Sequence, residues 1–153
     1  MKARTVTNLT DIFDTILKSE VCYVGMVDDS GMPYVLPMNF GLKDGFIYLH
    51  SARSGKKISI LEKNPKVCVC FSNEHFLRWQ NESVACSYSM KYKSVLAHGE
   101  VEFIEESEEK VRALNIIMHH YTGKEFKYSA PSIREILIWR VRVDKWEGRY
   151  YRY

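Results

Sequence analysis

The sequence predicts a mainly β protein, in which six or seven antiparallel strands form a barrel or closed sheet with three peripheral helices. Two observations favour this fold class. Short apolar segments rich in β-branched and aromatic residues recur along the chain, and turn signals such as residues 28–31 (DDSG) and 43–45 (KDG) separate them at hairpin spacing. The chain contains no internal repeat or long linker, so we expect a single domain over residues 1–153.

The first half of the chain is expected to contain two helices and four strands. Asn8 or Thr10 can cap the first helix, whose apolar residues repeat at four-residue spacing. A second, short helix begins at Lys56 and ends at Asn64, because the residue before Pro65 disfavours the helical conformation. The strands are expected over residues 21–27, 33–40, 46–50 and 67–71.

The second half of the chain is expected to contain three more strands and one longer helix. Ser107, followed by Glu108 and Glu109, suits the N-terminus of this helix, because short polar and acidic side chains are favourable there. Gly123 suits its C-terminal cap. The remaining predictions are an irregular segment over residues 74–81 and strands over residues 83–89, 93–104 and about 136–146.

The composition excludes several classes of protein. With 46% hydrophobic and 27% charged residues, the chain is typical of a globular protein. It has no run of about 20 apolar residues, as a membrane helix requires, and its N-terminus lacks the apolar core of a signal peptide, so we expect a cytoplasmic protein with no membrane contact. The net charge of +3 is too small and scattered to favour nucleic acid as a partner.

The cysteines and histidines do not form a recognisable metal site. No Cys-x-x-Cys pair occurs, and we interpret the cysteines as reduced, buried thiols in apolar strands: Cys22, Cys68, Cys70 and Cys86. His119 and His120 would diverge by about 100° on a helix, which favours a surface or interface pair over shared metal ligands. Motifs of serine hydrolases, zinc proteases and P-loop proteins are absent from the sequence.

Basic residues are concentrated in one segment, residues 53–66. Five Lys or Arg residues and a single acidic residue, Glu62, give this segment a local charge of +4, larger than that of the whole chain. Ser51, Ser54 and Gly55 precede Lys56 and Lys57 at the start of the expected short helix. Free backbone N–H groups and the positive end of the helix dipole favour an anion there, so we predict a phosphate-binding site.

Several segments carry a resemblance to a known group of proteins. They are residues 33–41 (PYVLPMNFG), 48–52 (YLHSA), 55–57 (GKK), 64–67 (NPKV), 92–95 (YKSV) and 99–101 (GEV). In this order and spacing, the chain resembles the FMN-binding split-barrel superfamily, which includes the pyridoxamine 5′-phosphate oxidases. His50 is similar to the strand-end histidine of its nitroimidazole-resistance (Nim-like) branch. The chain lacks the C-terminal Arg-x-His signature of authentic pyridoxamine phosphate oxidases, which argues against vitamin B6 oxidation.

The resemblance implies a split-barrel homodimer with FMN in clefts between the subunits. It implies that Lys56 and Lys57 hold the phosphate, and that Ser94 contacts the phosphate or the ribityl chain. The residues that it implies around the flavin ring are Met38, Asn39, Phe40, His50, Ser51 and Ala52.

These implications lead to a functional hypothesis with one alternative. The chain is expected to be an FMN-dependent oxidoreductase that takes electrons from NADH, NADPH or another reductant and reduces a small organic acceptor, with nitroaromatic compounds such as 5-nitroimidazoles as candidates. His50 is a candidate proton donor, although a structural histidine is an equally open interpretation. The alternative is a flavin- or haem-binding module of the same fold that turns over no substrate.

Overall fold

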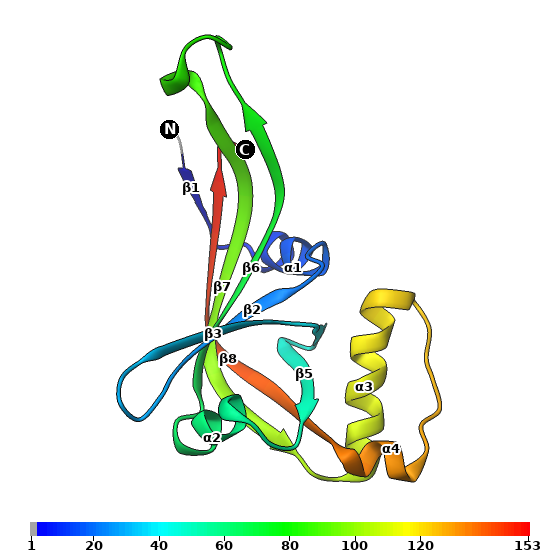
Figure 1. Ribbon diagram of the computed structural model, residues 1–153. Helices are drawn as coiled ribbons and strands as arrows, with labels where there is room; N and C mark the ends of the chain where they lie inside the picture. The colour runs from blue at the N-terminus through cyan, green and yellow to red at the C-terminus, as the bar shows by residue number, and fades with distance from the viewer. Residues whose placement is uncertain (1–2) are drawn as a thin grey trace.

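The computed structural model describes residues 3–153, which form eight strands, four α-helices and a short 3-10 turn (Figure 1). The strands are β1 (Ala3–Val6), β2 (Cys22–Val27), β3 (Pro33–Met38), β4 (Gly41–Lys43), β5 (Phe46–Ala52), β6 (Lys66–Arg78), β7 (Ser89–Ile104) and β8 (Ile136–Tyr151). The helices are α1 (Leu9–Leu17), α2 (Lys56–Lys63), α3 (Ser107–Thr122) and α4 (Ala130–Glu135), and the 3-10 turn covers Ala85–Ser87.

The strands form one antiparallel sheet in the order β3-β2-β6-β7-β8-β5-β4, and β1 adds to β8. The long strands β7 and β8 pair along most of their length, with a register shift between His98 and Gly99. A side chain at Gly99 would overlap the carbonyl oxygen of Arg142, so glycine is needed where the two backbones approach. Such a bulge bends a strand and lets the sheet curl around its core.

The core lies inside the curled sheet. Alternate residues of the strands point into it, among them the fully buried Trp139, Phe71 and Leu49. Phe40, from the segment between β3 and β4, packs edge-to-face on Phe71 with 4.9 Å between ring centroids. A smaller cluster beneath α3 contains Ile104, Ala113, Leu114 and Ile138.

Local sequence signals explain where the helices begin and end. The Asn8 side chain caps α1 by accepting hydrogen bonds from the backbone N–H groups of Thr10 and Asp11, at 2.8 and 3.2 Å. Helix α3 ends at Gly123, whose φ of 67° is the left-handed conformation typical of a C-terminal glycine. Its N-terminal cap is the Glu106 side chain, one residue before the predicted Ser107. None of the helices within residues 3–153 is long and apolar enough to cross a membrane.

The predicted fold class is confirmed, whereas several elements differ from the sequence prediction. Strand β6 continues to Arg78, so much of the expected irregular segment 74–81 is strand. The strand expected over residues 83–89 is wrong, since residues 83–88 form a loop with the 3-10 turn and β7 begins only at Ser89. Cys86 lies in this loop and is exposed, while Cys22 is buried as expected, which raises the pKa of its thiol to about 12. The short elements β1, β4 and α4 were not predicted.

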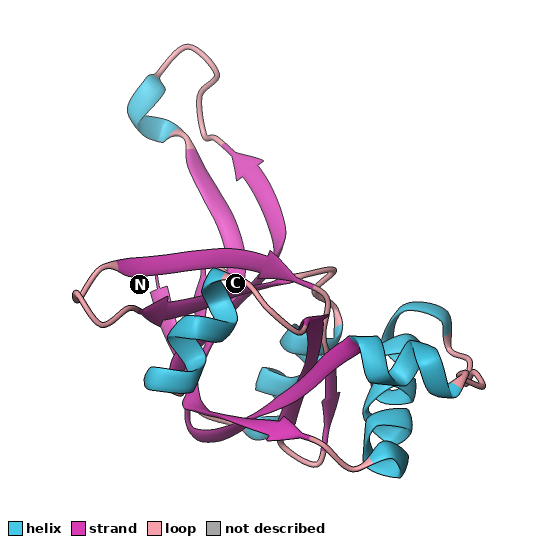
Figure 2. Cartoon of the chain, turned by 60° about the horizontal axis from the view of Figure 1, so that its bottom comes forward, coloured by secondary structure: helices cyan, strands magenta, loops and turns pink. Residues whose placement is uncertain are grey.

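Strands β6 and β7 form a hairpin that extends past the rest of the sheet (Figures 1 and 2). We call its end, residues 76–91, the arm. Here β6 and β7 pair with each other from Phe76–Lys91 to Arg78–Ser89. Among the described residues, β2 flanks β6 only as far as Cys70, and β8 flanks β7 only from Tyr92 onward. The arm is therefore a two-stranded ribbon without a third strand.

Candidate functional site

The sheet is open between its edge strands β3 and β4, which residues 39–40 join along the chain, and we call this opening the split. The sheet begins with β3 and ends with β4, and within residues 3–153 no ladder joins β3 to β5. Gly41 pairs with Tyr48 at one end of the short ladder between β4 and β5. Because the pairing is antiparallel, residues 38–40 and 50–52 both continue past this same end of the ladder.

Of residues 38–40, only Asn39 exposes its side chain. Met38 is buried and Phe40 is fully buried, whereas Asn39 between them is exposed. The carbonyl oxygen of Met38 accepts a hydrogen bond from the Cys22 thiol at 3.5 Å. Because the Phe40 ring belongs to the core, a ligand at the split meets the backbone of this residue and the side chain of Asn39.

Residues 50–52 form the end of β5, held on the other side by β8. His50 pairs with Ile138, Ser51 with Leu137 and Ala52 with Ile136. The His50 side chain reaches the surface, and the protein around it desolvates the imidazole and lowers its pKa below the ordinary histidine value. A histidine in this position is mostly neutral at pH 7.

Helix α2 begins directly after this strand with an uncapped N-terminus. Gly55 is its N-cap, with φ of 122° and no side-chain hydrogen bond to the helix. Such a terminus offers backbone N–H groups to an anion. Lys57, on the first turn, is half-buried.

The other basic residues of the segment 53–66 do not all converge on this terminus. The ammonium of Lys56 lies 4.9 Å from the centre of the Tyr34 ring, and its charge lowers the pKa of the Asp28 carboxyl, after that carboxyl's own hydrogen bonds to Ser30 and Met32. Arg53 donates to the carbonyl oxygens of Arg134 and Ile136, at 3.2 and 3.3 Å. Lys63 forms an exposed ion pair with Asp29 at 2.7 Å. Lys57 is therefore the better phosphate candidate of the predicted lysine pair.

Ser94 lies apart from the split, on the outer face of β7. Its neighbour Val95 is fully buried, so strand alternation points Ser94 away from the core. It pairs with Ser72 of β6, and its hydroxyl donates to the carbonyl oxygen of Arg149 at 3.3 Å. Within one chain, the structure does not bring Ser94 to the other predicted site residues.

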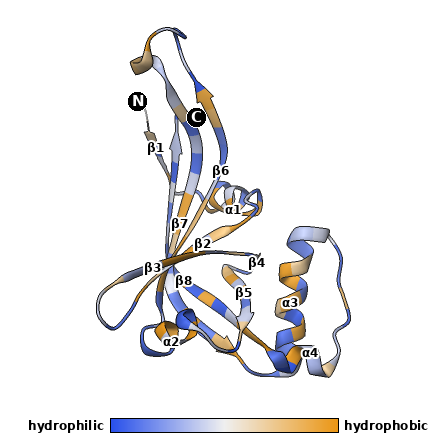
Figure 3. Ribbon diagram, in the orientation of Figure 1, coloured by the Kyte–Doolittle hydropathy of each residue, from blue (hydrophilic) through white to orange (hydrophobic). Residues whose placement is uncertain are grey.

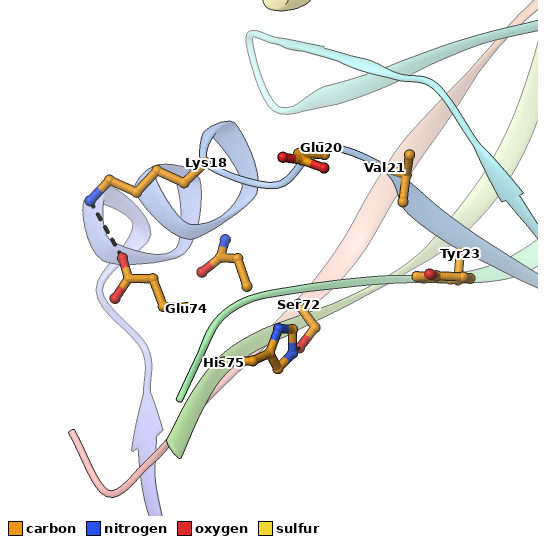
Figure 4. A pocket seen from close by; sticks show the side chains of 8 residues that line it. Lys18, Glu20, Val21, Tyr23, Ser72, Glu74 and His75 are labelled. Carbon is orange, nitrogen blue, oxygen red and sulfur yellow. Dashed lines mark hydrogen bonds and ion pairs between the residues drawn. The ribbon is translucent and has the colours of Figure 1, made fainter. Parts of the chain in front are cut away.

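A hollow of about 570 Å³ opens beside Ser72, at the base of the arm (Figure 4). The Ser72 hydroxyl lies 2.7 Å from Nε2 of His75, and Lys18 approaches Glu74 at 3.8 Å. A hydrogen bond from Lys93 is the largest of the contacts that lower the pKa of the Glu74 carboxyl. Sequence reasoning assigned Glu74 and His75 to an irregular segment, so it gave no signal for this polar hollow. Its lining residues are Lys18, Glu20, Val21, Tyr23, Ser72, Asn73, Glu74 and His75.

A curled antiparallel sheet left open between its first and last strands is a split barrel, and comparison with known proteins identifies the family. The family model described as pyridoxamine 5′-phosphate oxidase matches residues 9–150. The chain belongs to this family, within the FMN-binding split-barrel superfamily. A search of curated proteins finds no match.

Solved structures similar to this chain include flavin- and haem-binding proteins. A candidate 5-nitroimidazole antibiotic resistance protein from Bacteroides thetaiotaomicron is 44% identical, with a TM-score of 0.89 over 98% of this chain and 88% of that chain. The FAD and haem binding protein from Mycobacterium smegmatis is 16% identical, with a TM-score of 0.84 over 97% and 74% of the two chains. The flavocytochrome Anf3 from Azotobacter vinelandii is 17% identical, with a TM-score of 0.81 over 97% and 69%. These last two likenesses show the fold alone.

Proposed function

We propose that this protein binds FMN at the split and uses it to reduce a small organic acceptor of the nitroaromatic class. The observation that carries the proposal is the 44% identity, over 98% of this chain, to the candidate 5-nitroimidazole resistance protein. Local features also support a phosphate-bearing ligand: the α2 N-terminus is uncapped, Lys57 follows it, and Asn39 and His50 expose polar side chains.

Each part of the split has a role in this proposal. The α2 N-terminus and Lys57 neutralise the phosphate, and Lys56 contributes charge from the Tyr34 side. The backbone of residues 38–40, the Asn39 side chain and residues 50–52 orient the ring. When bound, the flavin supplies the electron transfer, with NADH, NADPH or another reductant as donor.

In this proposal, the protonated form of His50 donates the proton that the acceptor takes up. Desolvation favours its neutral form, so the protonated fraction is small at pH 7 and grows as the pH falls. The rate of acceptor reduction is therefore expected to rise on the acid side of neutrality, for as long as the protein stays folded.

The active form in this proposal is a homodimer with FMN between the subunits. Large apolar side chains are exposed on the arm and on the β2–β3 hairpin, as expected of surfaces that another chain covers. They are Phe76, Leu77, Trp79, Val84 and Met90 on the arm, and Tyr23, Val27, Met32 and Val35 on the hairpin. The colouring of Figure 3 shows the apolar segments along the ribbon. In this proposal, the outward-facing Ser94 contacts the flavin of the neighbouring subunit, because it lies apart from the split of its own chain.

The alternative is a module that binds flavin or haem without turnover. The names of the Mycobacterium smegmatis protein and of Anf3 support it, because these proteins of the same fold hold flavin together with haem. Steady-state oxidation of NADH or NADPH with a nitroaromatic acceptor separates the two functions. Flavin binding without turnover would favour the module.

The test of the binding proposal is the visible absorption spectrum of the purified protein, before and after incubation with FMN and desalting. We expect a retained, perturbed flavin spectrum at about one flavin per chain. The variant Lys56→Ala/Lys57→Ala should weaken FMN binding by about tenfold or more without unfolding, because charge-assisted phosphate contacts are lost. Lys63→Ala/Lys66→Ala removes the same charge nearby and serves as the control. Equal FMN affinity in both double variants would remove the lysine pair from the site.

A further inference from the structure

The segment that joins β3 to β4 is held from outside the sheet. Its backbone at Phe40 belongs to neither strand, and the Phe40 N–H donates a hydrogen bond to the phenol oxygen of Tyr121 at 3.2 Å. Tyr121 lies in the last turn of α3, 81 residues further along the chain. The conformation at this side of the split therefore depends on a helix that does not itself line it.

The Tyr121 phenol connects two segments through one oxygen atom. It accepts from the Phe40 N–H and donates its own proton to the carbonyl oxygen of Glu20 at 2.8 Å, just before β2. One donor and one acceptor bond suit a neutral phenol. Partial burial raises the pKa of Tyr121, so the hydroxyl keeps its proton throughout the neutral range.

His120 supports the same segment through the Phe40 ring. The centre of its imidazole lies 4.5 Å from the centre of that ring, and Nε2 lies 3.0 Å from the carbonyl oxygen of Ser19. Because a carbonyl can only accept, Nε2 carries the hydrogen. Phe71 packs on the ring from inside the core, so the side chain of Phe40 is confined by Phe71 and His120 while its N–H is held by Tyr121.

We infer that Tyr121 is a positioning residue for the flavin site, since it fixes the backbone of residues 39–40 in the orientation that receives the ring. This inference rests on the proposed function. Without the phenol, the Phe40 N–H has no partner, and the segment gains freedom that flavin binding must remove. The expected consequence is weaker binding, not loss of the fold, because the core around Phe40 and Phe71 stays intact.

Tyr121→Phe tests the inference, because it keeps the aromatic ring and removes the hydroxyl. We expect the dissociation constant for FMN, measured by quenching of flavin fluorescence, to rise about three- to tenfold. Hydrogen exchange of the Phe40 amide, followed by NMR, should become faster. The matched control is Tyr128→Phe, whose hydroxyl donates to Asn115 at 3.3 Å beside the same helix, and which should bind FMN like the wild type.

The outcomes separate this inference from the proposed function. Wild-type protein that fails to bind FMN overturns both. Wild-type binding together with unchanged affinity in Tyr121→Phe overturns the inference alone. A purely structural role for Tyr121 would lower the melting temperature of the variant without changing its FMN affinity or the visible circular dichroism of bound flavin, and this result also contradicts the inference.

Discussion

Strands β6 and β7 run through both the body of the sheet and the arm, yet their apolar side chains are buried in the body and exposed on the arm. In β6, Phe71 is fully buried, whereas Phe76 is 59% exposed only five residues later. The sequence is apolar in both places, and the difference lies in how many neighbouring strands flank the segment. Neighbouring strands flank the body on both sides, while the arm has no third strand among the described residues.

This difference shows that apolar character alone does not place a residue in a core. A two-stranded ribbon cannot bury its own side chains and is marginally stable in water. The stacked rings of Trp79 and Tyr88, with centroids 5.4 Å apart, give the arm some local order but leave Trp79 49% exposed. The body therefore contains the buried core, and the arm is the surface that the proposed homodimer would cover.

The largest expected effect separates the two regions by stability. Phe71→Ala should lower the free energy of unfolding by about 3–5 kcal/mol, because it leaves a cavity beside Phe40 in the core. Phe76→Ala should lower it by less than about 1 kcal/mol, since an exposed ring loses little on truncation. Urea denaturation of both variants at low protein concentration measures the difference. Similar losses at the two positions would mean that the arm is part of the cooperative core.

The next effect concerns association of subunits. Leu77→Asp places a charge on the apolar surface of the arm and should raise the dimer dissociation constant about tenfold or more, because a desolvated charge opposes the contact. Leu17→Asp, on α1, changes a side chain of similar exposure (52% against 56%) outside the arm and the β2–β3 hairpin, and serves as the control. Sedimentation velocity over a concentration series provides the measurement. A dimer equally stable in both variants would exclude the arm from the interface.

The sequence predicted the body better than the arm for the same physical reason. Strands such as β2 and β5 face a core on one side, so their side chains alternate, and the pattern is visible in the sequence. At the tip of the arm, the sequence predicts a buried strand, but Val84, Ala85 and Cys86 are exposed in a loop. Whether other parts of the protein cover a segment cannot be recognised from its local sequence. Strand β1 pairs with β8 near the opposite end of the chain, and this contact has no local signal.

In the candidate site, too, features encoded by local sequence could be predicted, whereas long-range contacts could not. The start of α2 at Gly55 and the lysines that follow could be predicted from local sequence, and anion binding there stays a prediction. The structure adds what no local pattern contains. Ser94 faces away from the split, Lys56 turns toward Tyr34, and Tyr121 holds Phe40 across 81 residues of sequence. Residues that position a site through long-range contacts form no motif of fixed spacing, so the sequence alone does not reveal them.

The smallest expected effect is the contribution of His50 to the pH dependence of the free energy of unfolding. The folded pKa of His50 is lowered, so the unfolded chain takes up this proton first as the pH falls. The contribution of His50 to stability is therefore intact above the unfolded histidine pKa of about 6.5 and is lost as the pH falls below it. His50→Gln should reduce the decline in the free energy of unfolding between pH 7 and pH 5, measured by urea denaturation. His75→Gln, at the exposed base of the arm, is the matched control.

The same proton connects this stability effect to the proposed activity. Under the proposed function, acceptor reduction should accelerate over the interval in which stability declines, because the imidazolium of His50 would be the proton donor. His50→Gln should flatten both pH profiles together, while His75→Gln should leave both unchanged. The His50→Gln variant could flatten the stability profile yet keep the acid acceleration. That result would support the desolvation of His50 but would show that another group delivers the proton.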